Sequence, residues 1–302
     1  MLINKDIAVH TNKVRLVPYC EHHVMRYHEW MKDPDIRLAT ASEALSLEDE
    51  YGMQRSWRTD KDKLTFISCQ SSSASSEIVS PLQQSQDEET NSMLGDVNLF
   101  ILANEEDSGN VSLVGELELM IGNKSNMRRG LGRAALLTFI AYVLKHEQEI
   151  LEEYFSAPRD MTPVDCLDYY RVKIGETNVK SIGLFESLGF KTTEGFPNFF
   201  GEYELRVSNL KAEDVDTMMK ERGIEGYAEV AYELGNDEKV RPVFEAQDER
   251  SAHSETGNST TAMAKNGLGE ALPLEAEKRE IKDGEGRSDS TTTTLGTVIS
   301  SG

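Results

Sequence analysis

A glycine-containing loop, Met127 to Ala134, lies between a predicted strand and a predicted helix, and its residue types suit an anionic ligand. A helix N-terminus presents N–H groups without acceptors and a partial positive charge. Gly130 and Gly132 would let an anion approach the backbone closely. Guanidinium groups, which suit phosphate, flank the glycines at Arg128, Arg129 and Arg133. The loop therefore predicts a diphosphate site.

Other glycine-loop chemistries fit this segment less well. No Gly-Lys-Ser/Thr follows, so the loop is not a Walker motif, and the dinucleotide pattern GxGxxG is incomplete. A plain turn with glycines that cap the helix is an equally good interpretation of the loop taken alone.

A second segment follows the pattern NxxSxxLFxxLGF from Asn178 to Phe190. It predicts a helix that begins near Asn178, with an amide free to bond a ligand, and ends at Gly189. Its apolar face would contain Ile182, Phe185 and Leu188. Alone, this pattern is better explained by a capped amphipathic helix.

Together the two segments resemble the GCN5-related N-acetyltransferase (GNAT) superfamily, in which a strand and an RxxGxG/A loop precede an asparagine-led helix ending in Gly-Phe. The resemblance covers about residues 12 to 207. The segments HEWMKDPDI, GDVNLF, GELELMI and RGLG resemble the eukaryotic N-acetyltransferase 9-like proteins. The resemblance to the superfamily implies an α+β (mixed α/β) fold, the GNAT acyl-CoA N-acyltransferase fold, with a central mixed sheet and flanking helices.

The resemblance implies acetyl-CoA as acetyl donor and places its parts on this chain. Its pyrophosphate would lie on the backbone of Arg128, Arg129, Gly130, Leu131, Gly132 and Arg133. Its pantetheine arm would run beside Leu119, Met120 and Ile121, with Asn178 and Phe185 nearby. The chain departs from the family pattern at Met127, where Gln or Arg is usual, and at Phe185, where many members have the tyrosine acid.

Transfer of an acetyl group to an amine needs a base for the amine proton and a donor for the developing oxyanion. The predicted strand Ser112 to Ile121 alternates, so Glu116 and Glu118 lie on one face. Either could relay the proton, Glu116 being the first choice, although a solvated strand face explains both. A backbone N–H near Met120 is the oxyanion donor implied by the resemblance.

The chain divides into a domain and two appended parts. We expect the acetyltransferase domain at 1–208, with a disordered insertion at about 70–93 and an acidic insertion, part helix and part loop, at about 147–166. Residues 209–246 are predicted to be a charged, partly helical extension. The Ser/Thr-rich acidic tail 247–302 has no apolar period and is predicted to be disordered.

The net charge of −21 argues against binding of nucleic acid or of a membrane surface, which needs clustered Lys and Arg. Three scattered cysteines predict neither a disulfide framework nor a zinc site. His22, His23 and His28 cluster, but surface positions explain them better than a metal, and we expect none. Without a signal core or a long apolar run, a cytoplasmic location is expected, with nuclear access left open.

Three functions are compatible with these residues. The first is acetylation of a protein α-amino or lysine amine, with tubulin or microtubules as a partner suggested by the resemblance. The second is acetylation of a small amine, such as a polyamine or an aminoglycoside-like molecule. The third is a weakly active or non-catalytic interaction protein linked to microtubules, suggested by the residues at 127 and 185.

Overall fold

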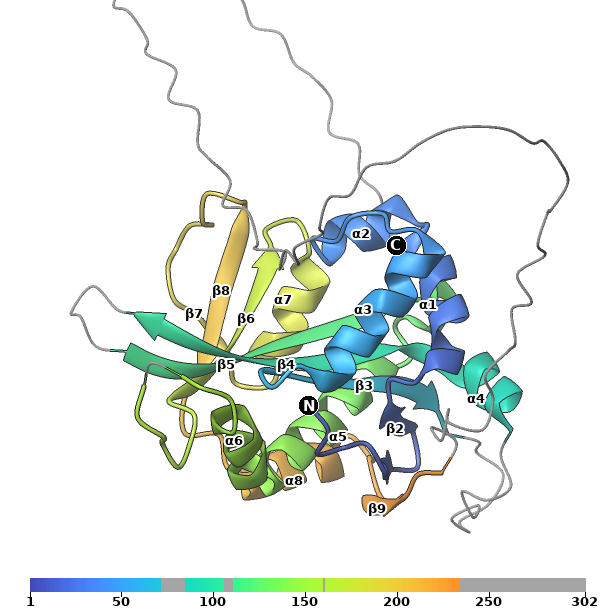
Figure 1. Ribbon diagram of the computed structural model, residues 1–302. Helices are drawn as coiled ribbons and strands as arrows, with labels where there is room; N and C mark the ends of the chain where they lie inside the picture. The colour runs from blue at the N-terminus through green and yellow to red at the C-terminus, as the bar shows by residue number, and fades with distance from the viewer. Residues whose placement is uncertain (72–84, 106–110, 160, 234–302) are drawn as a thin grey trace, which may run out of the picture. The chain divides into compact units, whose positions relative to one another are not determined.

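The computed structural model describes residues 1–71, 85–105, 111–159 and 161–233, which form a sheet flanked by helices (Figure 1). The strand order is β7-β8-β6-β5-β4-β3-β2-β1-β9. Neighbouring strands are antiparallel except β5 and β6, which are parallel. The predicted mixed sheet is confirmed. The strands are β1 (Ile7–His10), β2 (Val14–Pro18), β3 (Lys63–Gln70), β4 (Met93–Glu105), β5 (Val111–Ile121), β6 (Tyr169–Gly175), β7 (Lys191–Thr192), β8 (Glu202–Val207) and β9 (Ala228–Ala231).

Two apolar clusters hold the helices to the sheet. The α-helices are α1 (Val24–Met31), α2 (Pro34–Ala39), α3 (Leu47–Thr59), α4 (Gln86–Ser92), α5 (Leu131–Lys145), α6 (Glu147–Phe155), α7 (Val179–Glu186) and α8 (Ala212–Glu221). The larger cluster packs α5, α6, α7 and α8 on the sheet, and the smaller one packs α1. Strand β3 shows the alternation, since Phe66 belongs to the larger cluster and Ile67 to the smaller.

Helix α4 lies inside the stretch that the sequence predicts to be disordered. Residues 72–84 lie outside the described part, but the prediction is wrong for 85–92. Ser85 accepts a hydrogen bond from the Glu88 N–H, and the Glu88 carboxylate accepts one from the Ser85 N–H. This capping box starts the helix despite its polar composition.

Glu89 of α4 is fully buried at the centre of a polar cluster. Its carboxylate accepts hydrogen bonds from Arg15 at 2.7 Å, His22 at 2.9 Å, His23 at 3.0 Å and the Tyr232 hydroxyl at 2.7 Å. His23 is also fully buried, so the expectation of surface histidines is wrong for it. The cluster fastens α4 to β2, to the segment before α1 and to the residue that follows β9.

The structured domain continues beyond residue 208, the boundary predicted from the sequence. Helix α8 places Val215 and Met219 in the larger core, and β9 pairs with β1, with Ile7 opposite Ala231. The extension is therefore partly helical, as predicted, but it belongs to the sheet and core. Residues 234–246 and the predicted tail 247–302 lie outside the described residues.

The acidic insertion predicted at 147–166 contains a helix, α6, as expected. Its Ile150, Leu151 and Tyr154 are buried in the larger core. Its first acid also has a structural role, because the Glu147 carboxylate accepts a hydrogen bond from the Tyr170 hydroxyl at 3.0 Å. The acidic composition therefore marks one face of a packed helix.

We expect Glu89→Gln to lower the free energy of unfolding by about 3–5 kcal/mol, because it removes the buried carboxylate charge that faces the Arg15 guanidinium. Urea unfolding at pH 7 measures the loss. Glu88→Gln, which keeps the capping box at an exposed position, is the control and should change stability by less than about 0.5 kcal/mol. Equal, small losses in both variants would contradict a stabilising cluster.

Candidate active site

The edge of β5 that faces β6 is open along its last residues. The two strands pair only from Val114 opposite Tyr169 to Glu116 opposite Arg171. Beyond this point β5 pairs with β4 alone. Within the described part of the chain, no strand pairs with residues 117–121 on the edge that faces β6. Unpaired backbone groups of a strand are a template for an extended ligand. The predicted pantetheine position beside Leu119, Met120 and Ile121 is on this edge.

The glycine loop lies against the same part of β5. Gly130 is the N-cap of α5 with a φ of 77°, and no atom lies within 4 Å of where its Cβ would be. At Gly132 a Cβ would lie 3.5 Å from side-chain atoms of Leu119 and Ile121, so the helix start packs on the open strand. The first intrahelical bond is donated by Ala134 to Gly130. The earlier amides remain available to an anion.

The three arginines of the loop have different positions. Arg128 is exposed, with a φ of 63°, and no polar partner of its side chain occurs in the described part of the chain. Arg129 donates to Asn126 at 3.0 Å. Arg133 donates to Ser187, just after α7, at 3.1 Å and so links the two predicted cofactor segments. Arg128 is therefore the guanidinium most available to a phosphate.

Asn178 caps α7, but differently from the prediction that its amide would be free. Its Oδ1 accepts a hydrogen bond from the Ser181 N–H at 3.2 Å. The Nδ2 group has no partner within the described residues and can donate to a ligand. Phe185 is only 3% exposed and stacks edge to face on Phe190, at 5.2 Å between ring centres. Its side chain therefore serves the core, and its contact with the cofactor stays a prediction.

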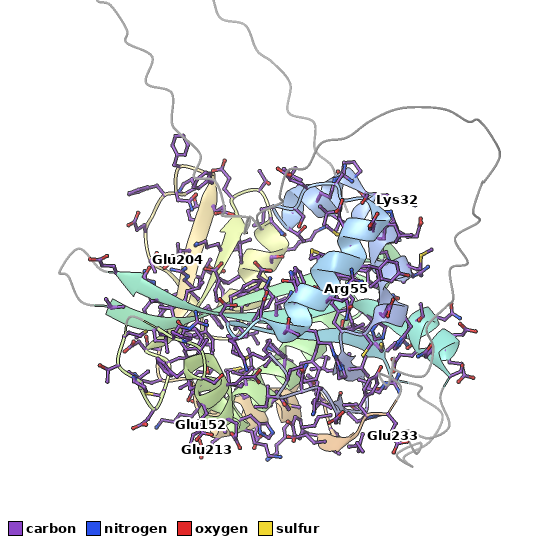
Figure 2. The ribbon with its side chains drawn as sticks, viewed as in Figure 1. Lys32, Arg55, Glu152, Glu204, Glu213 and Glu233 are labelled. Carbon is purple, nitrogen blue, oxygen red and sulfur yellow. The ribbon has the colours of Figure 1, made fainter. Side chains whose placement is uncertain are left out.

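Glu116 and Glu118 lie on one face of β5, as predicted, opposite Phe100 and Asn98 of β4. Arg171 Nε donates to Glu116 at 2.6 Å, and Lys173 Nζ lies 3.4 Å from the same oxygen. Arg171 Nη1 also lies 3.7 Å from Glu204, which Figure 2 labels on this sheet. The Glu116 carboxylate is thus engaged in an ion-pair network, and Glu118 is the better candidate for a base.

The pKa of Glu118 is raised to about 7. The largest cause is desolvation by surrounding protein atoms, followed by the charges of Asp96 and Glu116, while Lys63 and Lys173 oppose the shift. The residue is nevertheless exposed by area. Access to water and a pKa near neutrality are both properties that a proton acceptor needs.

Asp96 is a buried acid on this face that the sequence interpretation missed. It lies opposite Met120 of β5, and burial raises its pKa to about 6. One of its oxygens accepts from Asn98 at 3.0 Å and from the Tyr27 hydroxyl at 3.3 Å. An aspartate within the apolar strand segment GDVNLF was the available signal, because apolar strands seldom bury an acid without a partner or a function.

Cys20, His22 and His23 come close enough to suggest a metal site. Burial lowers the pKa of His23 to about 4, so its ring is neutral at pH 7. Its Nδ1 accepts from the Cys20 N–H at 3.0 Å, which leaves the proton on Nε2 for the bond to Glu89. Both nitrogens of His23 are satisfied by the protein, which explains the cluster without an ion.

Comparison with known proteins decides the family. A model of the acetyltransferase (GNAT) domain matches residues 13–191. The chain belongs to the GNAT acetyltransferase family. An N-acetyltransferase 9-like protein of Caenorhabditis briggsae is 40% identical over 219 residues, which are 70% of this chain and 91% of that protein. The human alpha/beta-tubulin-N-acetyltransferase 9 is 35% identical over 214 residues, 70% of this chain and 88% of its own.

Solved structures of GNAT proteins are also similar to this chain. An acetyltransferase of Bacillus anthracis aligns with 67% of this chain and 98% of its own, with a TM-score of 0.44 and 12% identity. As a GNAT acetyltransferase, this chain uses acetyl-CoA as acetyl donor. The open β5 edge and the start of α5, which has no side-chain cap, fit that ligand. The strand edge offers backbone pairing, and the free amides of a helix start suit phosphate. Among the described helices, none is long and apolar enough to cross a bilayer.

Proposed function

We propose that this acetyltransferase modifies the α-amino group of a protein, with Glu118 as the base. The observation that carries the proposal is the raised Glu118 pKa on the face of β5, beside the open edge. The amine nitrogen attacks the thioester carbon, the amine proton passes to Glu118, and the carbon–sulfur bond breaks so that coenzyme A leaves as its thiolate with the electron pair of that bond. A backbone N–H near Met120 would hold the developing oxyanion.

Proton transfer to Glu118 is less unfavourable from an α-amine than from a lysine because the α-amine has the lower pKa. An α-ammonium group has a pKa of about 7.7–8.0, so its proton passes to a base of pKa about 7 against a roughly tenfold unfavourable equilibrium. A lysine has a pKa of about 10.4, and the same transfer is more than about 1,000-fold unfavourable. The names of the mouse, fly and human relatives support α/β-tubulin as the acceptor. With this acceptor, the enzyme acts in the cytoplasm.

A small polyamine is the second candidate acceptor. Glu43 and Glu50 line a cavity between α1 and α3, and such acids would attract a compact cation. A cavity with mostly apolar walls suits a polycation less well, so we favour the protein acceptor. The non-catalytic alternative predicts acetyl-CoA binding without transfer.

We expect the enzyme to transfer one acetyl group to tubulin and to its N-terminal peptides, measured by mass spectrometry with isotope-labelled acetyl-CoA. The same peptides with a blocked α-amine and a free lysine are the controls and should remain unmodified. Spermidine is assayed in parallel. Modification of the blocked peptides, or of spermidine alone, would contradict the proposal, and tight acetyl-CoA binding without any transfer would support the non-catalytic alternative.

A further inference from the structure

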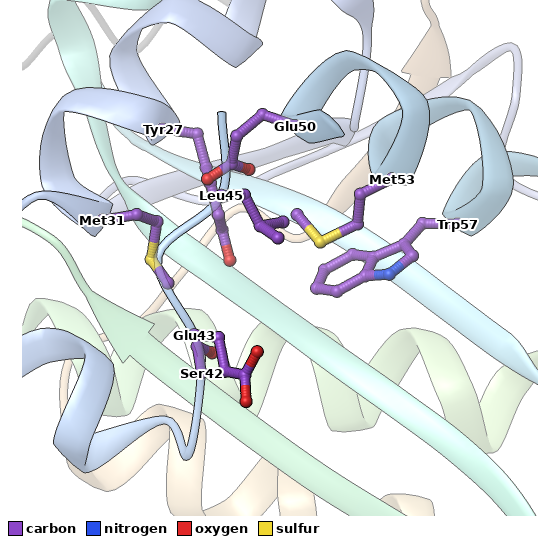
Figure 3. Close-up of a pocket in the computed structure, with 8 residues that line it drawn as sticks. All are labelled: Tyr27, Met31, Ser42, Glu43, Leu45, Glu50, Met53 and Trp57. Atoms are coloured by element: carbon purple, nitrogen blue, oxygen red, sulfur yellow. The ribbon is translucent and has the colours of Figure 1, made fainter. Parts of the chain in front are cut away.

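A cavity of about 200 Å³ lies between α1, α3 and the loop that joins α2 to α3 (Figure 3). At about 30 Å³ for each water, it has room for a long side chain. Its walls are mainly apolar: Tyr27, Met31, Leu45, Met53 and Trp57. Such walls suit the methylene stem of a ligand.

Of the two acids that line this cavity, Glu43 and Glu50, Glu50 is the buried one. The residue is 1% exposed, and neither carboxylate oxygen has a hydrogen bond within the described residues. The nearest basic side chain is that of His28, whose Nδ1 lies 3.7 Å away, too far for a hydrogen bond. The contrast with Glu89, which accepts from four side chains, shows how this fold treats a structural buried acid. A buried carboxylate without donors lowers stability, so Glu50 is better explained by a ligand that supplies them.

The cavity is connected to the reacting face of the sheet by α1. Tyr27 lines the cavity and donates to Asp96, which lies opposite Met120. Trp30 packs on Gly122, directly after β5, where a Cβ would lie 2.1 Å from the indole ring. Helix α1 therefore lines the cavity and also packs on the end of β5.

We propose that this cavity binds a cationic side chain, Lys or Arg, of the acceptor protein close to the amine that is acetylated. The stem packs on Met31, Met53 and Trp57, and the cationic head donates hydrogen bonds to Glu50. The inference deepens the proposed function and rests on it. It gives the enzyme a preference for acceptors with a basic residue near the N-terminus.

Glu50→Gln tests the proposal because it removes the charge and keeps the shape. The acceptor peptides carry arginine or its neutral analogue citrulline at the second position. We expect the Kd of the labelled arginine peptide, measured by fluorescence anisotropy, and its KM to rise at least about tenfold, while both change less than about twofold for citrulline. The Kd of acetyl-CoA should stay the same. Glu48→Gln, an exposed position on α3, is the matched control.

Thermal unfolding separates this binding role from a structural one. If Glu50 binds a ligand, Glu50→Gln should keep or raise the Tm, since it removes an unsatisfied buried charge. Two results would overturn the proposal. One is a fall in Tm together with an equal rise in Kd for the arginine and citrulline peptides. The other is an unchanged Kd for the arginine peptide. A second variant, Met53→Trp, fills the cavity without altering charge and should weaken binding of the arginine peptide in the same way.

The failure of this inference and the failure of the proposed function give different results. If wild-type enzyme binds both peptides equally but acetylates their α-amines, the subsite is wrong and the function stands. If neither peptide is acetylated and spermidine is, with a KM that depends on Glu50, the cavity holds the small amine and both proposals are wrong.

Discussion

Gly130→Glu is expected to weaken acetyl-CoA binding by about 100-fold or more, measured by titration calorimetry. Gly130 adopts a left-handed conformation at the start of α5, with open space around it. A glutamate there would place a negative charge beside the amides predicted to bind the pyrophosphate and oppose the favourable field of the helix N-terminus. The loss corresponds to about 2.7 kcal/mol of binding free energy or more.

Gly130→Asn is the matched control for backbone strain. Asparagine tolerates left-handed conformation better than other side chains and is a good N-cap, so this variant adds bulk without charge. It should keep acetyl-CoA binding within about tenfold of wild type, and both variants should remain folded by circular dichroism. Unchanged binding in Gly130→Glu would place the pyrophosphate elsewhere and contradict the cofactor site.

Glu118→Gln is expected to lower kcat by about 100-fold with little change in acetyl-CoA affinity, because a positioned base contributes roughly 10²–10⁴. The pH dependence gives the sharper signature. With a pKa of about 7, the Glu118 carboxylate is protonated and inactive as a base at lower pH, so kcat rises with pH through about 7. Glutamine does not titrate, so kcat of the variant should no longer rise with pH through about 7.

Glu116→Gln is the control on the same face of the strand. Glu116 is tied to Arg171 and Lys173, so its replacement should keep the rise of kcat with pH, moved to lower pH because the Glu116 charge is one cause of the raised Glu118 pKa. A stability loss is measured separately by thermal unfolding. If Glu116→Gln removes the rise of kcat with pH and Glu118→Gln retains it, the two carboxylates have the opposite roles to those proposed.

The local structure of the two predicted cofactor segments could be predicted from the sequence because it depends on neighbouring residues. Gly130 starts a helix and Asn178 caps another, and each position is marked by its immediate neighbours. The order of strands, loop and helices then follows from chain continuity. Helix α4 is also started by local residues, Ser85 and Glu88, but the polar composition of its segment predicts disorder and hides this signal.

The acceptor side could not be predicted because its contacts are distant along the chain. Asp96 accepts a hydrogen bond from the Tyr27 hydroxyl. Glu89 accepts one from the hydroxyl of Tyr232, which is 143 residues away. Glu50 looks like any acid of an exposed helix until the fold buries it. Likewise, the choice between Glu116 and Glu118 depends on Arg171, which a parallel strand brings beside β5. Strand alternation alone treats the two acids equally.

The pairing of β1 with β9 also determines the order in which this protein can be completed during synthesis. Ile7 and its neighbours emerge from the ribosome well before their partners around Ala231, which lie 224 residues later in the chain. At about 5–20 residues per second, the edge of β1 remains unpaired for on the order of tens of seconds. An unpaired edge is a template for association with other chains. We therefore expect nascent or C-terminally shortened chains to depend on chaperones far more than the finished enzyme.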